Sequence, residues 1–321
     1  MQEDQANKPE KNIPLLVVAG PTAVGKTALA VQLAHRLEGE IISADSMQVY
    51  RYLDIGTAKP TAAEREGIPH HLIDIVNPEE RFTVYNYQEL AQETIRDVFA
   101  RGKLPILAGG SGLYIKAVIE RFAFSRAEAD SLVRKELQEE VQNEGLAKLF
   151  QWLKKVDPEA AGRIHPNDAR RIIRALEYFR VTGEPISRQW DLTRKTQGPY
   201  RVHLAGLYLP RPMLYARIEQ RIDAMLVAGL LDEVRGLLDV VGYSPRLKSL
   251  QSLGYRHLVQ YLQGTWTWDE AISYFKQDTR KYAKRQLTWF RAEPRIQWYE
   301  VRPEKPLEPV LDAISMNVEG L

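Results

Sequence analysis

A glycine-rich loop constrains this chain more than any other feature. It fits the pattern G-x-x-x-x-G-K-[ST], and its residues are Gly20, Pro21, Thr22, Ala23, Val24, Gly25, Lys26 and Thr27. An apolar run typical of a strand precedes it, and a segment with helical spacing follows it. Glycines let backbone N–H groups turn inward around phosphate oxygens, and the start of the helix adds positive dipole character. We therefore predict that residues 20–27, the phosphate loop, bind phosphate groups, with the Thr27 hydroxyl available to Mg²⁺.

The pattern around this loop predicts an α/β fold. Short apolar runs at residues 15–19, 41–44, 72–76 and 105–108 read as strands, and residues 85–101 have the spacing of a helix. Strands that alternate with helices form a parallel sheet covered on both faces. We expect a P-loop NTPase-like core in which such a sheet is flanked by helices.

The pattern changes at about residue 122. Residues 130–150 and 168–182 are amphipathic helices with no strand between them, and residues 202–209 return to a strand. We predict that residues 13–121 and 201–321 form the α/β core with C-terminal helices. Residues 122–200 are then a helical insertion domain, and residues 1–12 are a disordered tail.

Composition excludes several classes of protein. The chain has no cysteine, so disulfides and thiolate chemistry are impossible. No apolar run approaches the ~20 residues of a membrane span, and the N-terminus lacks an apolar signal region. We expect a cytoplasmic protein without membrane contact. The net charge of +2 does not by itself indicate nucleic-acid binding, so clustering of charge matters more than the total.

Asp45 is the first candidate catalytic residue. It follows the second predicted strand, and in parallel sheets ligands bind at the carboxyl ends of the strands. Gly20 and Gly109 also follow strands, so all three are expected to converge on one pocket. Asp45 is either a base that accepts a proton from an acceptor group or a cap of the following turn. His70 and His71 are adjacent on an extended segment and point apart, which disfavours a shared metal.

Basic residues cluster in three places. Arg170, Arg171 and Arg174 lie on one side of a predicted helix and suit RNA phosphates, although without other evidence a solvated helix face is the better explanation. Residues 276–291 mix basic and aromatic side chains, which suits RNA, while some of these positions look like core. Arg217 and Arg221 lie one helical turn apart, and they either clamp a pyrophosphate or pair with neighbouring acids.

Seven segments, taken together, resemble the bacterial tRNA dimethylallyltransferase (tRNA isopentenyltransferase) family. In chain order they are GPTAVGKT at 20–27, DSMQVYRYLDIGTAKP at 45–60, PHHLID at 69–74, AGGSGLY at 108–114, RIHPNDARRIIRALE at 163–177, SLGYR at 252–256 and AKRQLTWFR at 283–291. A phosphate loop alone would be a weak signal, but seven segments in one order span nearly the whole chain.

The resemblance implies a reaction. The donor is dimethylallyl pyrophosphate, and the acceptor is N6 of the adenosine immediately 3′ of the tRNA anticodon. By resemblance, Asp45 receives the N6 proton and Thr22 contacts the pyrophosphate bridge. Lys26, Thr27 and Mg²⁺ neutralise the pyrophosphate charge, and Arg217 holds the departing pyrophosphate, with Arg221 beside it.

The resemblance also implies an interface with the anticodon stem-loop of tRNA, and we expect the enzyme to be a monomer. The expected contacts are Asp45, Ser46, Met47, Gln48, Ser111, Arg134, Arg170, Arg171, Ile172, Ile173, Arg174, Gln251 and Arg256.

Three other functions stay open from the sequence. A nucleotide or small-molecule kinase would share the loop and an acid after the second strand, but it would not need the basic insertion. An adenylate isopentenyltransferase would prenylate free AMP, ADP or ATP. A non-catalytic RNA-binding protein would keep a vestigial loop, although the intact Lys26, Thr27 and Asp45 favour chemistry.

Overall fold

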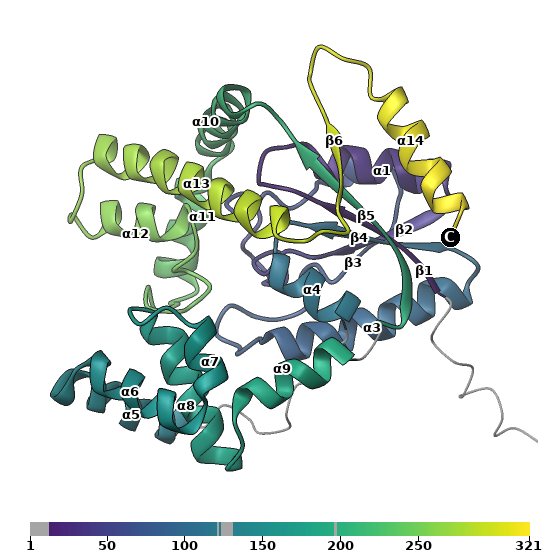
Figure 1. Cartoon of the computed structure of the whole chain (residues 1–321). Coiled ribbons are helices and arrows are strands. Elements are labelled where there is room, and N and C mark those ends of the chain that lie inside the picture. Colours follow the sequence, from purple (N-terminus) through teal and green to yellow (C-terminus); the bar gives the residue numbers. More distant parts are fainter. Residues whose placement is uncertain (1–12, 121, 123–130, 196–197) are drawn as a thin grey trace, which may run out of the picture. The chain divides into compact units, whose positions relative to one another are not determined.

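The computed structural model describes residues 13–120, 122, 131–195 and 198–321 (Figure 1). The chain divides into two compact units. The first comprises Met1–Ile119 and Pro199–Leu321, and the second is Glu120–Gly198. The bounds of the second unit lie close to those expected for the insertion. The expected tail, residues 1–12, lies outside the described residues.

A six-stranded parallel sheet organises the first unit. Its order is β3-β2-β4-β1-β5-β6. The strands are β1 (Ile13–Ala19), β2 (Gly39–Ser43), β3 (His70–His71), β4 (Leu104–Gly109), β5 (Tyr200–Tyr208) and β6 (Gln297–Glu300). The central strand β1 is apolar along its whole length because both faces of the sheet are covered. The predicted α/β class is confirmed.

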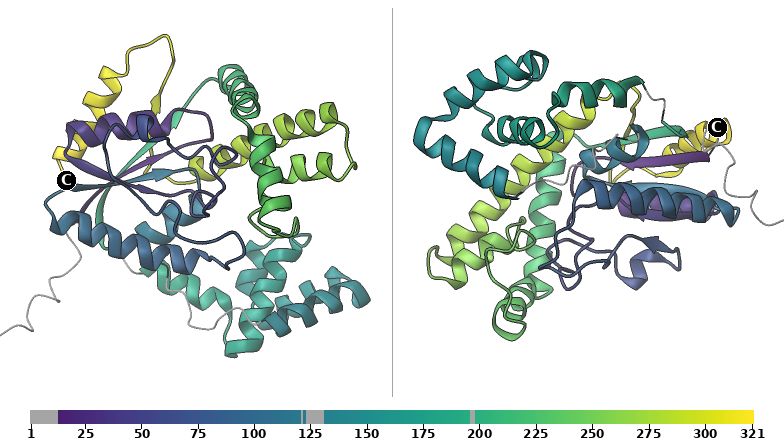
Figure 2. Two further views of the ribbon diagram at one scale, coloured as in Figure 1. Left: turned by 180° about the vertical axis from the view of Figure 1, so that it is seen from behind. Right: turned by 90° about the horizontal axis from the view of Figure 1, so that it is seen from below.

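Helices cover both faces of this sheet. Figures 1 and 2 show α1 (Lys26–Arg36) and α14 (Glu308–Glu319) on one face, and α3 (Val84–Ala100) on the opposite face. The short α2 (Ala62–Arg65) precedes β3, and α4 (Gly112–Glu120) follows β4. Since all strands run parallel, the loops after β1, β2 and β4 share one edge of the sheet.

Further helices pack together in the same unit, beyond β5. They are α10 (Arg211–Val227), α11 (Leu230–Arg235), the π-helical turn η1 (Gly236–Val240), α12 (Tyr255–Leu262) and α13 (Trp268–Arg291). Helix α13 packs on both α10 and α12. A capping box at Thr267 and Glu270 fixes the start of α13. The buried side of α13 belongs to the apolar core of the first unit through residues such as Phe275 and Phe290.

The second unit is entirely helical in its described part. It consists of α5 (Ser131–Glu144), α6 (Leu146–Val156), α7 (Pro158–Arg163), α8 (Ala169–Thr182) and α9 (Ile186–Lys195). It has its own apolar core, which includes Leu137, Leu153, Ile172 and Leu176. The amphipathic pattern of α8 therefore reflects burial within this unit.

Two expected elements were wrong in detail. The strand expected at residues 72–76 is instead the short β3, because Leu72 and Asp74 adopt left-handed backbone conformations that end a strand. The helix expected at residues 130–150 is interrupted at Gly145, whose φ is 83°.

Candidate active site

The phosphate loop joins β1 to α1 in a conformation that requires its glycines. Gly20 and Gly25 have φ values of 154° and 104°. A Cβ on Gly20 would lie 2.7 Å from the Leu207 backbone oxygen, so β5 leaves no room for a side chain there. A Cβ on Gly25 would instead face the Arg217 guanidinium, at 3.8 Å from Nη2. Arg217 of α10 thus lies over the loop.

Two more cations adjoin the loop. The Lys26 Nζ donates to the Pro21 carbonyl at 2.7 Å, and Arg221 Nη1 donates to Thr22 Oγ1 at 3.5 Å. Burial, reinforced by the charge of Arg221, lowers the pKa of Lys26 to about 7, against an opposing effect of Asp45. Burial likewise lowers the pKa of Arg221. Cations crowded this closely around inward backbone N–H groups form an anion site.

Arg217 and Arg221 do not pair with the neighbouring acids that the sequence left as an alternative. Glu219 pairs with Arg280, and Asp223 pairs with Lys276 at 2.6 Å. This arrangement leaves both α10 arginines beside the loop, which favours the clamp.

Asp45 caps the turn that follows β2, and its position also leaves it facing a cavity. Its Oδ1 accepts the Met47 backbone N–H at 2.8 Å, so it caps the turn after β2. Its carboxylate also lines a cavity beside the phosphate loop, and no described residue makes a further hydrogen bond to it. One oxygen holds the turn, and the other is available to an acceptor group.

Three loops meet at this edge of the sheet. Ser111 Oγ accepts the Ser46 N–H at 2.9 Å, and the Ser111 N–H donates to the Ala44 carbonyl at 3.1 Å. A Cβ on Gly109 would lie only 2.1 Å from that same carbonyl oxygen. The segments after β2 and β4 therefore meet as expected, although neither Gly20 nor Gly109 is among the residues that line the cavity.

Gln286 is a site residue that the sequence did not single out. Its buried side chain extends from α13, accepts the Thr22 N–H at 2.9 Å and donates to the Gly110 carbonyl at 3.0 Å. It therefore ties the phosphate loop to the loop after β4. The signal was present, because Gln286 shares a helical face with the buried Ala283 and Phe290.

The cavity next to the loop has a volume of about 280 Å³ and a mixed lining. Its polar side chains include Thr22, Asp45 and Arg221. Its apolar side chains, several of them from one face of α10, are Ile218, Ile222, Met225, Leu253 and Phe275. Such a cavity can hold a small ligand with an anionic end and a hydrocarbon end.

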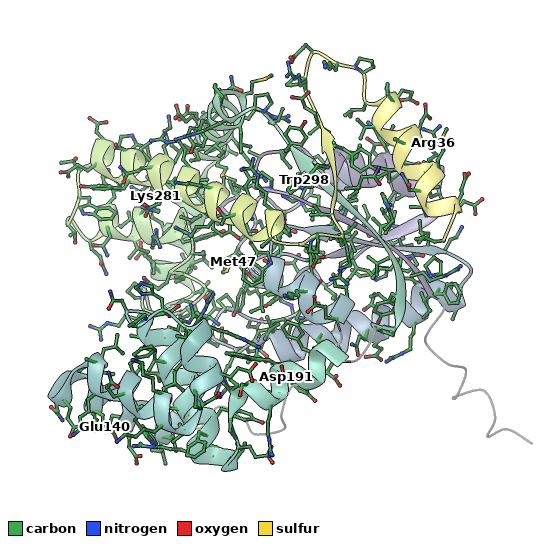
Figure 3. The ribbon with its side chains drawn as sticks, in the orientation of Figure 1. Arg36, Met47, Glu140, Asp191, Lys281 and Trp298 are labelled. Atoms are coloured by element: carbon green, nitrogen blue, oxygen red, sulfur yellow. The ribbon has the colours of Figure 1, made fainter. Side chains whose placement is uncertain are left out.

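Several predicted RNA contacts line this cavity. They are Asp45, Ser46, Met47, Gln251 and Arg256, and Met47 is labelled in Figure 3. The side chain of Arg256 is held by Asp278 of α13. These residues come from two segments far apart in sequence, which the fold brings to the same cavity.

Gln48 was expected to contact tRNA, but its side chain is used for hydrogen bonds within the protein. Its amide oxygen accepts from Ser43 Oγ at 3.0 Å, and its NH₂ group donates to the carbonyls of Thr57 and Ala58 at 3.3 and 3.1 Å. Because these bonds use both N–H donors, Gln48 holds the 57–58 loop and is not free to read a base edge.

The four arginines of the second unit that were predicted to contact RNA fall into two groups. Arg170 and Arg171 are exposed. Arg134 and Arg174 instead bind the fully buried carboxylate of Glu177, at 2.6 and 3.0 Å. A buried carboxylate needs this compensation, so both arginines have a structural function in addition to any contact with RNA.

Ile172 and Ile173 were wrong as expected RNA contacts. Their side chains are 0% and 9% exposed, and they pack in the core of the second unit. The sequence motif contains them because α8 needs an apolar face.

The two histidines also have separate partners. His70 Nδ1 lies 2.9 Å from the Ile68 carbonyl, and His71 Nε2 lies 2.7 Å from Glu40. Among the described residues, no group of three or more His, Asp or Glu side chains has the arrangement of a metal site. In the same part of the chain, no helix is long and apolar enough to cross a membrane.

The fold and site define a phosphate-loop α/β protein with an anion site beside an apolar cavity. Residues 48–293 match the family model described as IPP transferase. The chain belongs to the IPP transferase family.

Curated relatives and solved structures agree with this assignment. A tRNA dimethylallyltransferase from Moorella thermoacetica is 50% identical, and the match covers 95% of this chain and 96% of the relative. One from Carboxydothermus hydrogenoformans is 48% identical over 94% and 96%. The tRNA isopentenylpyrophosphate transferase of Bacillus halodurans has a TM-score of 0.71 at 44% identity, covering 95% and 97%. A eukaryotic dimethylallyltransferase acting on tRNA has a TM-score of 0.82 at 28% identity, covering 97% and 79%.

Proposed function

We propose that this protein transfers a dimethylallyl group from dimethylallyl pyrophosphate to N6 of the adenosine 3′-adjacent to the tRNA anticodon. The products are N6-(dimethylallyl)adenosine and pyrophosphate. Membership of the family and the names of its relatives support the reaction. The observation that carries it is the cavity, which joins a cation-rich phosphate loop, the Asp45 carboxylate and an apolar wall.

The donor fits both the polar and the apolar side chains that line this cavity. Backbone N–H groups of the phosphate loop, together with Lys26, Arg217 and Arg221, offset the charge of the pyrophosphate. The apolar face of α10, with Ile218 and Ile222, is suited to the hydrocarbon group. Pyrophosphate alone would leave these apolar side chains unused, whereas a prenyl pyrophosphate contacts both the cations and the apolar lining.

Mg²⁺ fits the same site. The Thr27 side chain is exposed at the first turn of α1, directly after Lys26. Mg²⁺ in phosphate sites commonly takes few protein ligands and completes its shell with phosphate oxygens and water, so one hydroxyl is a sufficient anchor. When bound, the ion would add positive charge to the leaving pyrophosphate.

The bond changes follow from the positions of these groups. The allylic C–O bond breaks, and pyrophosphate keeps its electron pair, stabilised by the loop and the α10 arginines. The N6 lone pair forms the new C–N bond, and the proton that N6 loses goes to the open oxygen of Asp45. Thr22 lies beside the pyrophosphate, where Arg221 and Gln286 hold it.

The adenosine must leave the stacked anticodon loop to reach Asp45, which costs a few kcal/mol. Contacts to RNA phosphates offset this cost. We assign these contacts to Arg170 and Arg171, to the 251–256 segment and to the exposed basic side of α13, which carries Lys284 and Arg285.

The experiment that tests this function is transfer of labelled dimethylallyl pyrophosphate, with Mg²⁺, to unmodified tRNA and to AMP in parallel. The proposal predicts label in tRNA, on the adenosine 3′ of the anticodon, and none on AMP. Label on AMP alone would indicate a nucleotide prenyltransferase. Transfer of phosphate from ATP, without any prenyl transfer, would indicate a kinase.

A further inference from the structure

Glu233 of α11 makes an unusual set of contacts at the edge of the cavity. Its carboxylate accepts three consecutive backbone N–H groups, from Asp54 at 3.0 Å, Ile55 at 2.8 Å and Gly56 at 3.2 Å. It also accepts the Tyr255 hydroxyl at 2.5 Å. Successive N–H groups that point to one spot form an anion-binding concavity, and here a side chain of the protein itself fills it.

The loop held by Glu233 forms one wall of the cavity. Gly56, Thr57 and Ala58 face the cavity. A Cβ on Gly56 would lie 2.4 Å from the Tyr255 ring, so this backbone rests directly on the ring. The Gln48 amide binds the carbonyls of the same loop from the other side. The loop is therefore anchored through its N–H groups by Glu233 and through its carbonyls by Gln48.

Tyr255 connects Glu233 to a second wall. It is the first residue of α12 and is fully buried. Its neighbours Gln251, Ser252, Leu253 and Arg256 line the same cavity. Burial and the neighbouring Glu233 carboxylate raise the pKa of the Tyr255 hydroxyl, so it stays protonated and acts as a donor.

We propose that Glu233 is a positioning residue that fixes the spacing between the 56–58 wall and the 251–256 wall of the cavity. The inference rests on the proposed function, in which the 251–256 segment contacts the RNA and Asp45, which lines the same cavity, receives the N6 proton. Glu233 itself does not line the cavity. It acts on the RNA substrate through the two walls and leaves the phosphate loop untouched.

A carboxylate is required because all four contacts are donors. One carboxylate oxygen accepts the N–H groups of Asp54 and Ile55, and the other accepts the Gly56 N–H and the Tyr255 hydroxyl. In Glu233→Gln the amide NH₂ group takes the place of one of these oxygens, so in either orientation at least one backbone N–H of the 54–56 loop loses its acceptor. The lost bond leaves a donor without a partner and lets the walls move apart. Tyr255→Phe removes only the link to the second wall.

The test compares Glu233→Gln and Tyr255→Phe with the control Asp232→Asn. Asp232 precedes Glu233 on α11, carries the same charge and pairs at the surface with Arg235 at 3.3 Å. For each protein we would measure kcat and KM for tRNA, the Kd of tRNA, and the Kd of pyrophosphate with Mg²⁺. We expect Glu233→Gln to lower kcat/KM for tRNA by about tenfold or more and to weaken tRNA binding. The Kd of pyrophosphate for Glu233→Gln should stay within about twofold of the wild-type value. Tyr255→Phe should lower kcat/KM for tRNA and weaken tRNA binding in the same way but to a smaller extent. Asp232→Asn should match the wild type in all of these values.

Two results would overturn the inference. One is an equal loss of tRNA and pyrophosphate binding in Glu233→Gln, which would mean a general loss of structure. The other is wild-type behaviour of both variants. If Glu233→Gln does not fold, Tyr255→Phe decides, because it removes one hydroxyl and no carboxylate. A wild type that binds tRNA but transfers nothing would contradict the proposed function, and the tRNA affinities of the variants would still test the wall spacing.

Discussion

Lys26 sits where its charge is unfavourable until an anion arrives. Its ammonium group donates to the Pro21 carbonyl while Arg221 and Arg217 lie nearby, and its pKa falls to about 7. A bound pyrophosphate reverses this balance, because an opposite charge at contact favours the protonated amine. Burial is the main reason that the pKa of Lys26 is low, and the charge of Arg221 adds to it.

Because the pKa of Lys26 is low in the free enzyme, we predict that the enzyme takes up a proton when pyrophosphate binds. Above pH 7 the free enzyme holds Lys26 largely neutral, and the complex holds it charged, so at pH 8 binding should take up close to one proton per site. The uptake should disappear below about pH 6, where Lys26 is already protonated. Calorimetry in buffers of different ionisation enthalpy measures it. Lys26→Arg is the control, because arginine stays charged throughout. Equal uptake in both proteins would contradict the assignment.

Individual residues also mark the limit of prediction from sequence. The motifs located the phosphate loop and Asp45 at the correct strand ends because spacing and glycine content are local properties. The partners of Gln48 and Gln286 lie 5 to 264 residues away in the chain, so only the folded structure reveals that their amides are used internally. Ile172 and Ile173 lay in a motif that mixes a buried face with an exposed one.

At the scale of elements, the site depends on how closely the loops after β2 and β4 approach. Gly109 ends β4 against the Ala44 backbone, which cannot yield as a side chain can. The Ser111 contacts to Ala44 and Ser46 then fix where Asp45 projects. A single missing Cβ thus sets the spacing of two loops.

Gly109→Ala should therefore destabilise the first unit by at least about 1–3 kcal/mol, the usual cost of overpacking. Gly236→Ala is a matched control in the same unit. Gly236 has helical angles, and a Cβ there meets nothing within 4 Å. It should be neutral or stabilise by up to about 1 kcal/mol, since alanine is the better helix former. Urea unfolding measures both. Equal changes in the free energy of unfolding of the two variants would show that the close approach of Gly109 to the Ala44 backbone is not a constraint.

Elements with a strong period were predicted well, and short ones were not. The long helices and the central strands carry their apolar pattern locally. Strand β6 was not predicted, because its sequence QWYE begins and ends with polar residues and lacks the apolar run that marked residues 41–44. Helix α14 has buried Leu311, Ile314 and Val318 at helical spacing, so its signal was present and was overlooked. The break at Gly145 depended on backbone φ, which composition does not give.

For the whole molecule, total charge conceals where cations gather. The chain carries 44 basic and 42 acidic residues, yet three cations surround one loop and two exposed arginines lie together on α8. The second unit has its own core, so changes on its exposed surface need not affect the sheet unit.

Replacing both Arg170 and Arg171 by Ala should weaken tRNA binding and reduce its salt dependence. Each lost phosphate contact lowers the slope of log Kd against log salt by roughly 0.7–0.9, so the double variant should lose about 1–2. Pyrophosphate binding should not change. Arg188→Ala, an exposed arginine of the same unit outside the expected contacts, serves as the control. Titrations of tRNA at several salt concentrations measure the slopes. An unchanged slope in the double variant would show that Arg170 and Arg171 face solvent and do not contact RNA phosphates.

The proposed reaction depends most on Asp45 as the base that receives the N6 proton. Asp45→Asn is the sharpest variant, because its amide oxygen still accepts the Met47 N–H and preserves the turn. The measurement is single-turnover transfer from labelled dimethylallyl pyrophosphate to tRNA that is already bound to enzyme with Mg²⁺. We predict that the transfer rate falls by about 10²–10⁴-fold while the Kd of tRNA changes little. A transfer rate close to that of the wild type would contradict the account and leave Asp45 as a cap of its turn.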